Sequence, residues 1–129
     1  MNPASPSPLP LVSDRRFSVV SYARGHGLLL LRSGKTDEHL TRIDILITDV
    51  RAMEIRSWFT GIEIAETDEQ YLAGFQSKPV EMVEVGNRIY SLKGNGWCGF
   101  VVGGVLFVHE DELEFGEPSG LIPDHPNSN

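Results

Sequence analysis

TRIDILIT, residues 41–48, is the stretch that decides the fold class of this chain. One face of this segment carries Ile43, Ile45 and Ile47, and the other carries Arg42, Asp44 and Thr48. Successive side chains of a β-strand point to opposite faces of its sheet, so this alternation predicts a strand with one buried face. Only Leu46 interrupts the polar face, which we expect to meet solvent.

The same two-residue period continues on both sides of this strand. Upstream, residues 15–22 and 27–32 flank Arg24-Gly25-His26-Gly27, a segment suited to a tight turn, and are expected to form a hairpin. Downstream, residues 49–61 keep the alternation. A turn at Gly61 into the next apolar residues would complete a meander of three strands.

The second half of the chain predicts further short strands. They are expected at 80–85, 87–93, 97–102, 105–110 and, as an acidic edge strand, 111–115. Glycines 94 and 96 and glycines 103 and 104 would form the hairpin loops between the three middle segments. Residues 94–99 also match the phosphate-binding pattern G-x-G-x-x-G, but β-branched and aromatic residues follow instead of a helix. We therefore interpret them as a glycine-rich hairpin.

A helix is predicted at one place, near residues 68–76. Thr67 or Asp68 can accept hydrogen bonds from the first turn, and the apolar residues that follow share one helical face. With one helix and many short strands, the predicted fold is all-β, or a β-rich α+β. It is an antiparallel roll or barrel of about eight or nine strands.

The chain of 129 residues has room for one domain. Residues 1–12 and 118–129 are rich in proline and small polar residues, and they are expected to be a disordered leader and tail. The single β-rich domain would then span residues 13–117.

The formal charge is −7, and it is unevenly distributed. Residues 1–60 carry eight Lys or Arg against six Asp or Glu, whereas residues 61–129 carry three against twelve. Because phosphate-backbone binding requires a basic surface, nucleic acid is not an expected partner.

The apolar runs and the first residues of the sequence allow a prediction of the cellular location. The longest near-apolar run, residues 97–108, is shorter than the roughly 20 residues that span a bilayer, and the start has no signal-peptide pattern. We therefore expect a soluble, cytoplasmic protein without a membrane partner. The single cysteine, Cys98, cannot form an internal disulfide, and we expect it to pack as a small buried apolar residue.

Four residues near predicted turns are candidates for binding: Tyr22, Arg24, Trp58 and Trp97. Tryptophan, tyrosine and arginine dominate the energetics of protein interfaces, so a cluster at one rim of a barrel would form a docking patch. No catalytic residues are predicted, because the chain has no nucleophile motif with a matching base. No cofactor is predicted either.

The weaker candidates are His109, Glu110 and Glu112, which could supply ligands to a metal ion. Their spacing does not match a known metal motif, and adjacent strand residues point to opposite faces. The sequence thus favours a non-enzymatic interaction module that recognises a protein partner, or associates with itself, through a sheet edge and turn aromatics. The alternative is a small barrel that binds a ligand or metal, such as a hydrolase, with Arg24 or Arg88 anchoring an anion.

Overall fold

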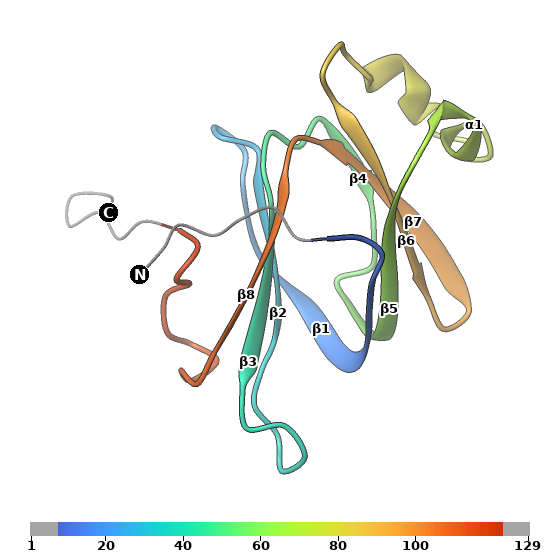
Figure 1. The fold of residues 1–129 in the computed structure, drawn as a ribbon. Helices are drawn as coiled ribbons and strands as arrows, with labels where there is room; N and C mark the ends of the chain where they lie inside the picture. Colours follow the sequence, from blue (N-terminus) through green and yellow to red (C-terminus); the bar gives the residue numbers. More distant parts are fainter. Residues whose placement is uncertain (1–7, 123–129) are drawn as a thin grey trace.

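The computed structural model describes residues 8–122, and these form one antiparallel sheet folded over into two layers (Figure 1). The strands are β1 (Leu11–Ala23), β2 (Leu28–Ser33), β3 (Arg42–Ile47), β4 (Ala52–Glu54), β5 (Trp58–Thr67), β6 (Arg88–Gly94), β7 (Trp97–Gly103) and β8 (Leu106–Asp111). Their order in the sheet is β4-β7-β6-β5-β1-β2-β3-β8. The predicted all-β class, with one short α-helix, is therefore confirmed.

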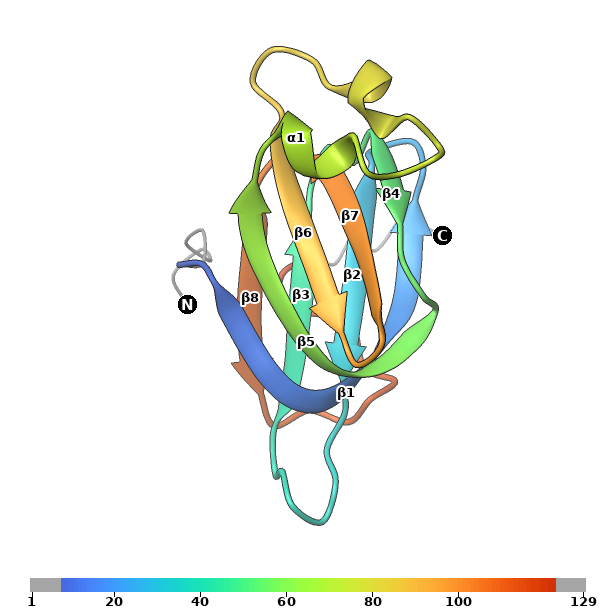
Figure 2. The ribbon, with the colours of Figure 1, turned by 90° about the vertical axis from the view of Figure 1, so that its right-hand side faces the viewer.

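The long strand β1 joins the two layers. Its first part pairs with β5 and its last part with β2, so it passes from one layer into the other (Figure 2). The predicted hairpin of β1 and β2 is confirmed, with its turn at residues 24–27. The bend is accompanied by a bulge in β1 opposite Gly61, whose φ of 80° favours glycine.

Three predicted connections are wrong. Gly61 lies inside the continuous strand β5 and forms no turn. The meander fails because β4 pairs with β7 instead of β3. Glycines 103 and 104 do not close a hairpin, since β8 pairs with β3 across the molecule. A glycine is compatible with a tight turn, but it is equally compatible with a continuous strand or with a longer connection to a distant strand. The sequence around a glycine therefore does not determine which strands pair.

The main core lies between the two layers. Its buried members come from both layers: Phe17, Leu29, Leu31, Ile45, Ile47, Val50, Phe59, Ile62, Ile64, Tyr90, Leu92, Val101 and Leu106. Ile45 and Ile47 have no exposed surface, as the alternation of β3 predicts. This shared core fixes the two layers against each other and so sets the relative positions of their turns.

The outer face of β6 and β7 is covered by an apolar segment. It contains α1 (Glu69–Leu72), capped by Asp68 as predicted, and a 3₁₀-helix at Pro79–Met82. Leu72 is fully buried there against Phe100 and its neighbours. The extended strand predicted at 80–85 is therefore wrong, because these residues continue the cover over the sheet.

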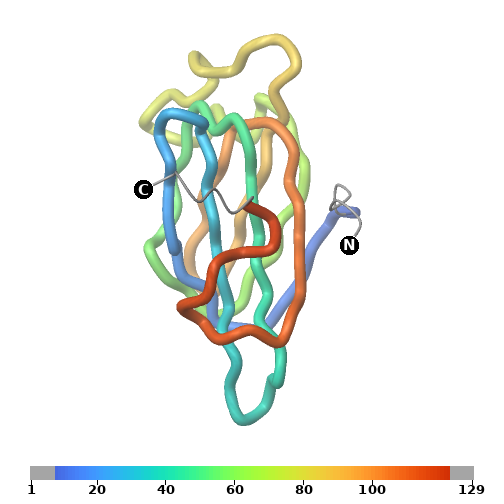
Figure 3. Tube along the Cα trace, turned by 90° about the vertical axis from the view of Figure 1, so that its left-hand side faces the viewer, coloured from blue at the N-terminus to red at the C-terminus, as the bar shows by residue number. Residues whose placement is uncertain are grey.

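The outer face of β2, β3 and β8 is covered as well, by the C-terminal segment that follows β8 (Figure 3). Arg42 and Asp44 have no exposed surface beneath it, so the prediction that this face of β3 meets solvent is wrong. The edge strand predicted at 111–115 is also wrong, since β8 ends at Asp111.

Residues on either side of the expected domain of 13–117 contact it. Leu11 and Val12 pair with β5, and Ser119 is buried. The remaining parts of the predicted leader and tail, residues 1–7 and 123–129, lie outside the described residues. Between residues 8 and 122, neither helical segment has the length and apolar character needed to cross a membrane.

Candidate binding groove

An open groove lies where the start of β5 meets the turn between β6 and β7. Its volume is about 480 Å³, and it is lined by Arg56, Ser57, Trp58, Phe59, Thr60, Asn95 and Trp97. In Figure 2 this turn lies against the first part of β5 at the lower end of the sheet. The fold thus brings two of the predicted binding residues, Trp58 and Trp97, to one site.

Trp97 is a rigid wall of the groove. Its ring lies 5.1 Å from the ring of Phe59, which is 3% exposed and belongs to the main core. Gly94 makes this position possible, because a Cβ there would lie 2.2 Å from Nε1 of Trp97. The packing holds the indole in place before any ligand arrives, which lowers the entropy cost of binding.

The turn that carries Trp97 is also held in place. Gly94 pairs with Trp97, so Asn95 and Gly96 form a two-residue loop, and the φ of Gly96 is 77°. The side-chain amide of Asn95 donates a hydrogen bond of 3.2 Å to the backbone carbonyl of Thr60. The hairpin predicted from the glycines is confirmed, and its tip is tied to β5.

Trp58 is the exposed wall of the groove. It retains 53% of its surface, and the guanidinium carbon of Arg16 lies 4.3 Å from its ring centroid. Because Phe17 is buried in the core, Arg16 points to the outer face of β1, which pairs here with β5. Stacking on arginine orients an otherwise mobile indole and leaves much of its surface open.

A second arginine covers the other tryptophan. The guanidinium carbon of Arg56 lies 5.6 Å from the ring centroid of Trp97. Among residues 8–122, neither Arg16 nor Arg56 forms an ion pair with a carboxylate. The groove therefore combines two aromatic surfaces with two guanidinium groups whose charge is not locally neutralised.

Tyr22 and Arg24 do not line this groove. Trp58 is opposite Ser18 on β1, whereas Tyr22 and Arg24 lie further along the chain, at the hairpin turn with β2. Tyr22 is 39% exposed. The structure separates these two predicted binding residues from Trp58 and Trp97, because β1 is long and bends between them.

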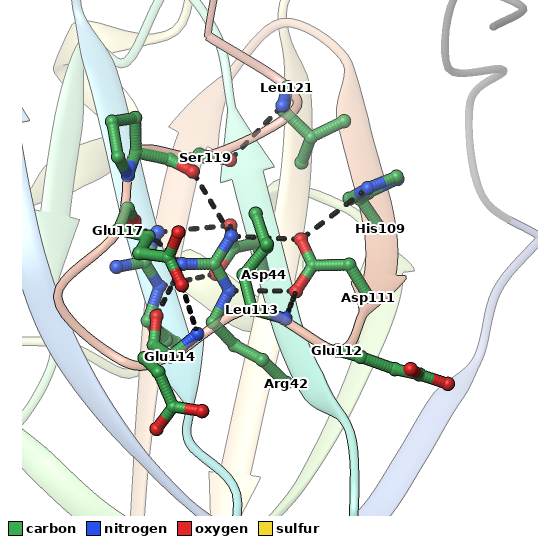
Figure 4. A network of polar contacts seen from close by, with 12 residues as sticks. Arg42, Asp44, His109, Asp111, Glu112, Leu113, Glu114, Glu117, Ser119 and Leu121 are labelled. Carbon is green, nitrogen blue, oxygen red and sulfur yellow. Dashed lines mark hydrogen bonds and ion pairs between the residues drawn. The ribbon is translucent and has the colours of Figure 1, made fainter.

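The metal candidates point in different directions (Figure 4). His109 Nε2 lies 3.6 Å from a carboxylate oxygen of Asp111, while Glu110 accepts a hydrogen bond from Thr41 on the other face. Figure 4 shows Glu112 directed away from His109 and Asp111. No group of three His, Cys, Asp or Glu side chains in residues 8–122 is arranged to hold a metal ion.

Asp111 belongs instead to a buried network with Arg42. Burial acts to raise the pKa of Asp111, but hydrogen bonds from Arg42 and from the backbone N–H of Leu113 outweigh it, and the pKa is lowered. The hydrogen bond with Asp111 in turn raises the pKa of Arg42. Both groups are therefore charged at neutral pH and act as structural groups.

Cys98 is exposed, so the prediction of a buried apolar role is wrong. It lies on the outer face of β7 next to Tyr71, whose hydroxyl donates a hydrogen bond of 2.7 Å to the carbonyl of Gly99. Burial, together with the nearby thiol of Cys98, raises the pKa of Tyr71 to about 12. Tyr71 thus remains neutral and fixes α1 on the sheet.

Sequence reasoning missed Arg56 and Asn95 as groove residues, and Arg16 as the residue that covers Trp58. One signal was present, since Arg56 and Trp58 are two residues apart and can share a strand face. Arg16 and Asn95 carry no such signal. Arg16 lies beside Trp58 because β1 pairs with β5, and Asn95 lies there because the distant β6–β7 turn packs against β5.

Comparison of the chain with known protein families, with curated proteins and with solved structures found no match. The groove must therefore be interpreted from its own geometry.

Proposed function

We propose that this protein is a non-enzymatic binding module that recognises a segment of a protein partner in the groove between β5 and the β6–β7 turn. The observation that carries the proposal is the pair of tryptophans in one groove, one rigid and one exposed, each covered by an arginine. Tryptophan and arginine are the residues most enriched at the energetic centres of protein interfaces.

The shape of the groove also supports a peptide-like ligand. It is open to solvent and lies between the start of β5 and a hairpin tip, so we expect an extended segment to enter without a change in the backbone. Ser57 and Thr60 add hydroxyl groups, and the carbonyl of Thr60 is already engaged by Asn95. Polar groups beside a fixed aromatic wall provide orientation as well as contact area.

Selection from a random peptide library displayed on phage tests this function. We expect the wild-type protein to enrich peptides that Trp58→Ala does not retain, because the truncated side chain supplies the largest exposed apolar surface of the groove. Leu40→Ala is the matched control, since Leu40 is 76% exposed and lies outside the groove.

Two outcomes contradict the proposal. One is the recovery of the same peptides by the wild type and by Trp58→Ala. The other is a concentration-dependent dimer of the wild type that dissociates in Trp58→Ala, measured by sedimentation. That result would assign the groove to self-association instead of partner recognition.

A further inference from the structure

The two arginines of the groove differ from the other arginines that the structure buries or pairs. Arg32 bonds to Asp44, Arg42 to Asp111, and Arg51 to Asp49 and Glu84. Within residues 8–122, Arg16 and Arg56 have an aromatic face as their described partner and no carboxylate. In a protein of net charge −7, carboxylates are abundant, so their absence from this groove is a local property of the site.

Stacking leaves the hydrogen-bonding edge of each guanidinium free. A guanidinium is planar, and its five N–H donors lie in the plane, whereas the tryptophan ring occupies one face. Within residues 8–122, neither Arg16 nor Arg56 is paired with a carboxylate, so their N–H donors are available to a ligand. Planar, bidentate pairing with a carboxylate is the interaction that such an edge favours.

A second pocket is lined by Arg16, the residue that contacts Trp58 of the groove. It has a volume of about 200 Å³, and Arg15, Arg16, Arg32, Lys35 and His39 supply its cationic or titratable side chains. Arg15, Arg32 and Lys35 are each paired with a carboxylate of this chain, at 3.7, 2.6 and 2.5 Å. Arg16, which contacts Trp58, is therefore the arginine of this pocket that has no carboxylate partner within residues 8–122.

From these observations, and resting on the proposed function, we infer that the ligand of the groove is an acidic peptide segment. Its apolar side chains would contact Trp58 and Trp97, and its carboxylates would pair with Arg16 and Arg56. The net charge of −7 opposes the close approach of a nucleic acid backbone, whereas a short acidic segment needs only the local field of the two guanidiniums.

The peptides recovered by selection on the wild-type protein provide the test. We expect them to be enriched in Glu and Asp relative to the starting library. A recovered peptide in which each Glu or Asp is replaced by its amide should bind at least about fivefold more weakly, as measured by fluorescence polarisation. The double variant R16Q and R56Q should bind the acidic peptide more weakly than the wild type does, by the same factor. It should bind the acidic peptide and its amide-substituted form with equal affinity.

Arg51→Gln is the matched control, because Arg51 is exposed and remote from the groove lining. Peptides that depend on Trp58 but show no enrichment in Glu or Asp would overturn the acidic ligand and leave the binding module intact. If no Trp58-dependent peptide is recovered, the proposed function itself fails. A single-stranded oligonucleotide that displaces the recovered peptides at equal concentration would overturn the inference in favour of nucleic acid.

Discussion

The two layers of this protein are covered on their outer faces by segments of opposite character. The segment with α1 packs on β6 and β7 through apolar side chains, with Phe75 and Phe100 rings 4.8 Å apart and Leu72 fully buried. The C-terminal segment is held on β2, β3 and β8 by Arg42 and Arg32. One cover depends on removing apolar surface from water, and the other on satisfying buried charge.

Arg42 shows how the polar cover works. All five of its N–H donors are used: two on Asp111 and one each on the carbonyls of Glu114, Glu117 and Pro118. Arg42 has no exposed surface, so its donors depend on these bonds and not on water. A buried arginine that is fully satisfied fixes one path for the segment above it, because any other path leaves donors unpaired.

Removal of Arg42 should have the largest effect. Arg42→Ala leaves Asp111 without its arginine and three carbonyls without a donor, while Asp44 keeps its ion pair with Arg32. We expect a loss of about 3–5 kcal/mol in the free energy of unfolding, measured with urea. Arg51→Ala, which removes an exposed paired arginine, should change it by less than about 0.5 kcal/mol. A loss below about 1 kcal/mol for Arg42→Ala would show that the segment is not held by this network.

Truncation in the apolar cover should cost less. Leu72→Ala creates a cavity, but the short α1 can shift to close part of it, so we expect the lower part of the range of about 2–5 kcal/mol. Leu113→Ala, at an exposed position of the polar cover, should cost less than about 1 kcal/mol. Equal losses for the two leucines would contradict the distinction between the covers.

Acid should weaken the polar cover selectively. The pKa of Asp111 is lower in the folded protein than its unfolded value of about 3.9, so its stabilisation is present above that pH. The stabilisation is lost as the pH falls from about 3.9 through the lower folded pKa, and the loss is smaller than that of Arg42→Ala. The stability gap between the wild type and Asp111→Asn should narrow over this range, while the gap to Leu72→Ala stays constant. Urea unfolding at several pH values measures both differences in the free energy of unfolding. If the difference between the wild type and Asp111→Asn did not change with pH, Asp111 would not be the group whose protonation weakens the polar cover.

Tyr71 should give the smallest effect. Tyr71→Phe removes the hydrogen bond to Gly99 and should cost about 0.5–1.5 kcal/mol at neutral pH. Because the folded pKa of Tyr71 is raised to about 12, its contribution is present below the unfolded value of about 10 and is lost as the pH rises toward 12. Burial also raises the pKa of Tyr90. Tyrosinate absorbance should therefore lose one of its late-titrating components in Tyr71→Phe. Loss of a component that titrates at about pH 10 would contradict the buried position of the hydroxyl.

The two covers also explain what could be predicted from the sequence. Tyr71, Leu72 and Phe75 are spaced as one helical face, so the apolar cover left a visible pattern and Asp68 marked its start. Arg42 and Asp44 alternate with isoleucines in the manner of a solvent-exposed strand face. Whether such a face meets water or protein depends on the C-terminal segment, which lies far from β3 in the sequence. The local pattern of β3 therefore cannot predict it.

The residues of the candidate groove also fall into two groups, those that the sequence indicated and those that only the structure revealed. The turn aromatics Trp58 and Trp97 were recognisable by residue type, and the glycines beside Trp97 predicted its hairpin. The absence of Tyr22 and Arg24 from the groove, and the contact of Arg16 with Trp58, followed only from the pairing of β1 with β5.

The amino-acid sequence alone determined that the chain forms short antiparallel strands with one capped helix, because residue periodicity and turn chemistry are local properties. The tertiary structure decided that β8 joins β3, that Arg42 is buried, and that Arg16 and Arg56 flank two tryptophans. These features depend on contacts between residues far apart in the chain. Burial of the core between the two layers stabilises these contacts, and the free energy of that burial depends on several segments together and not on any one of them.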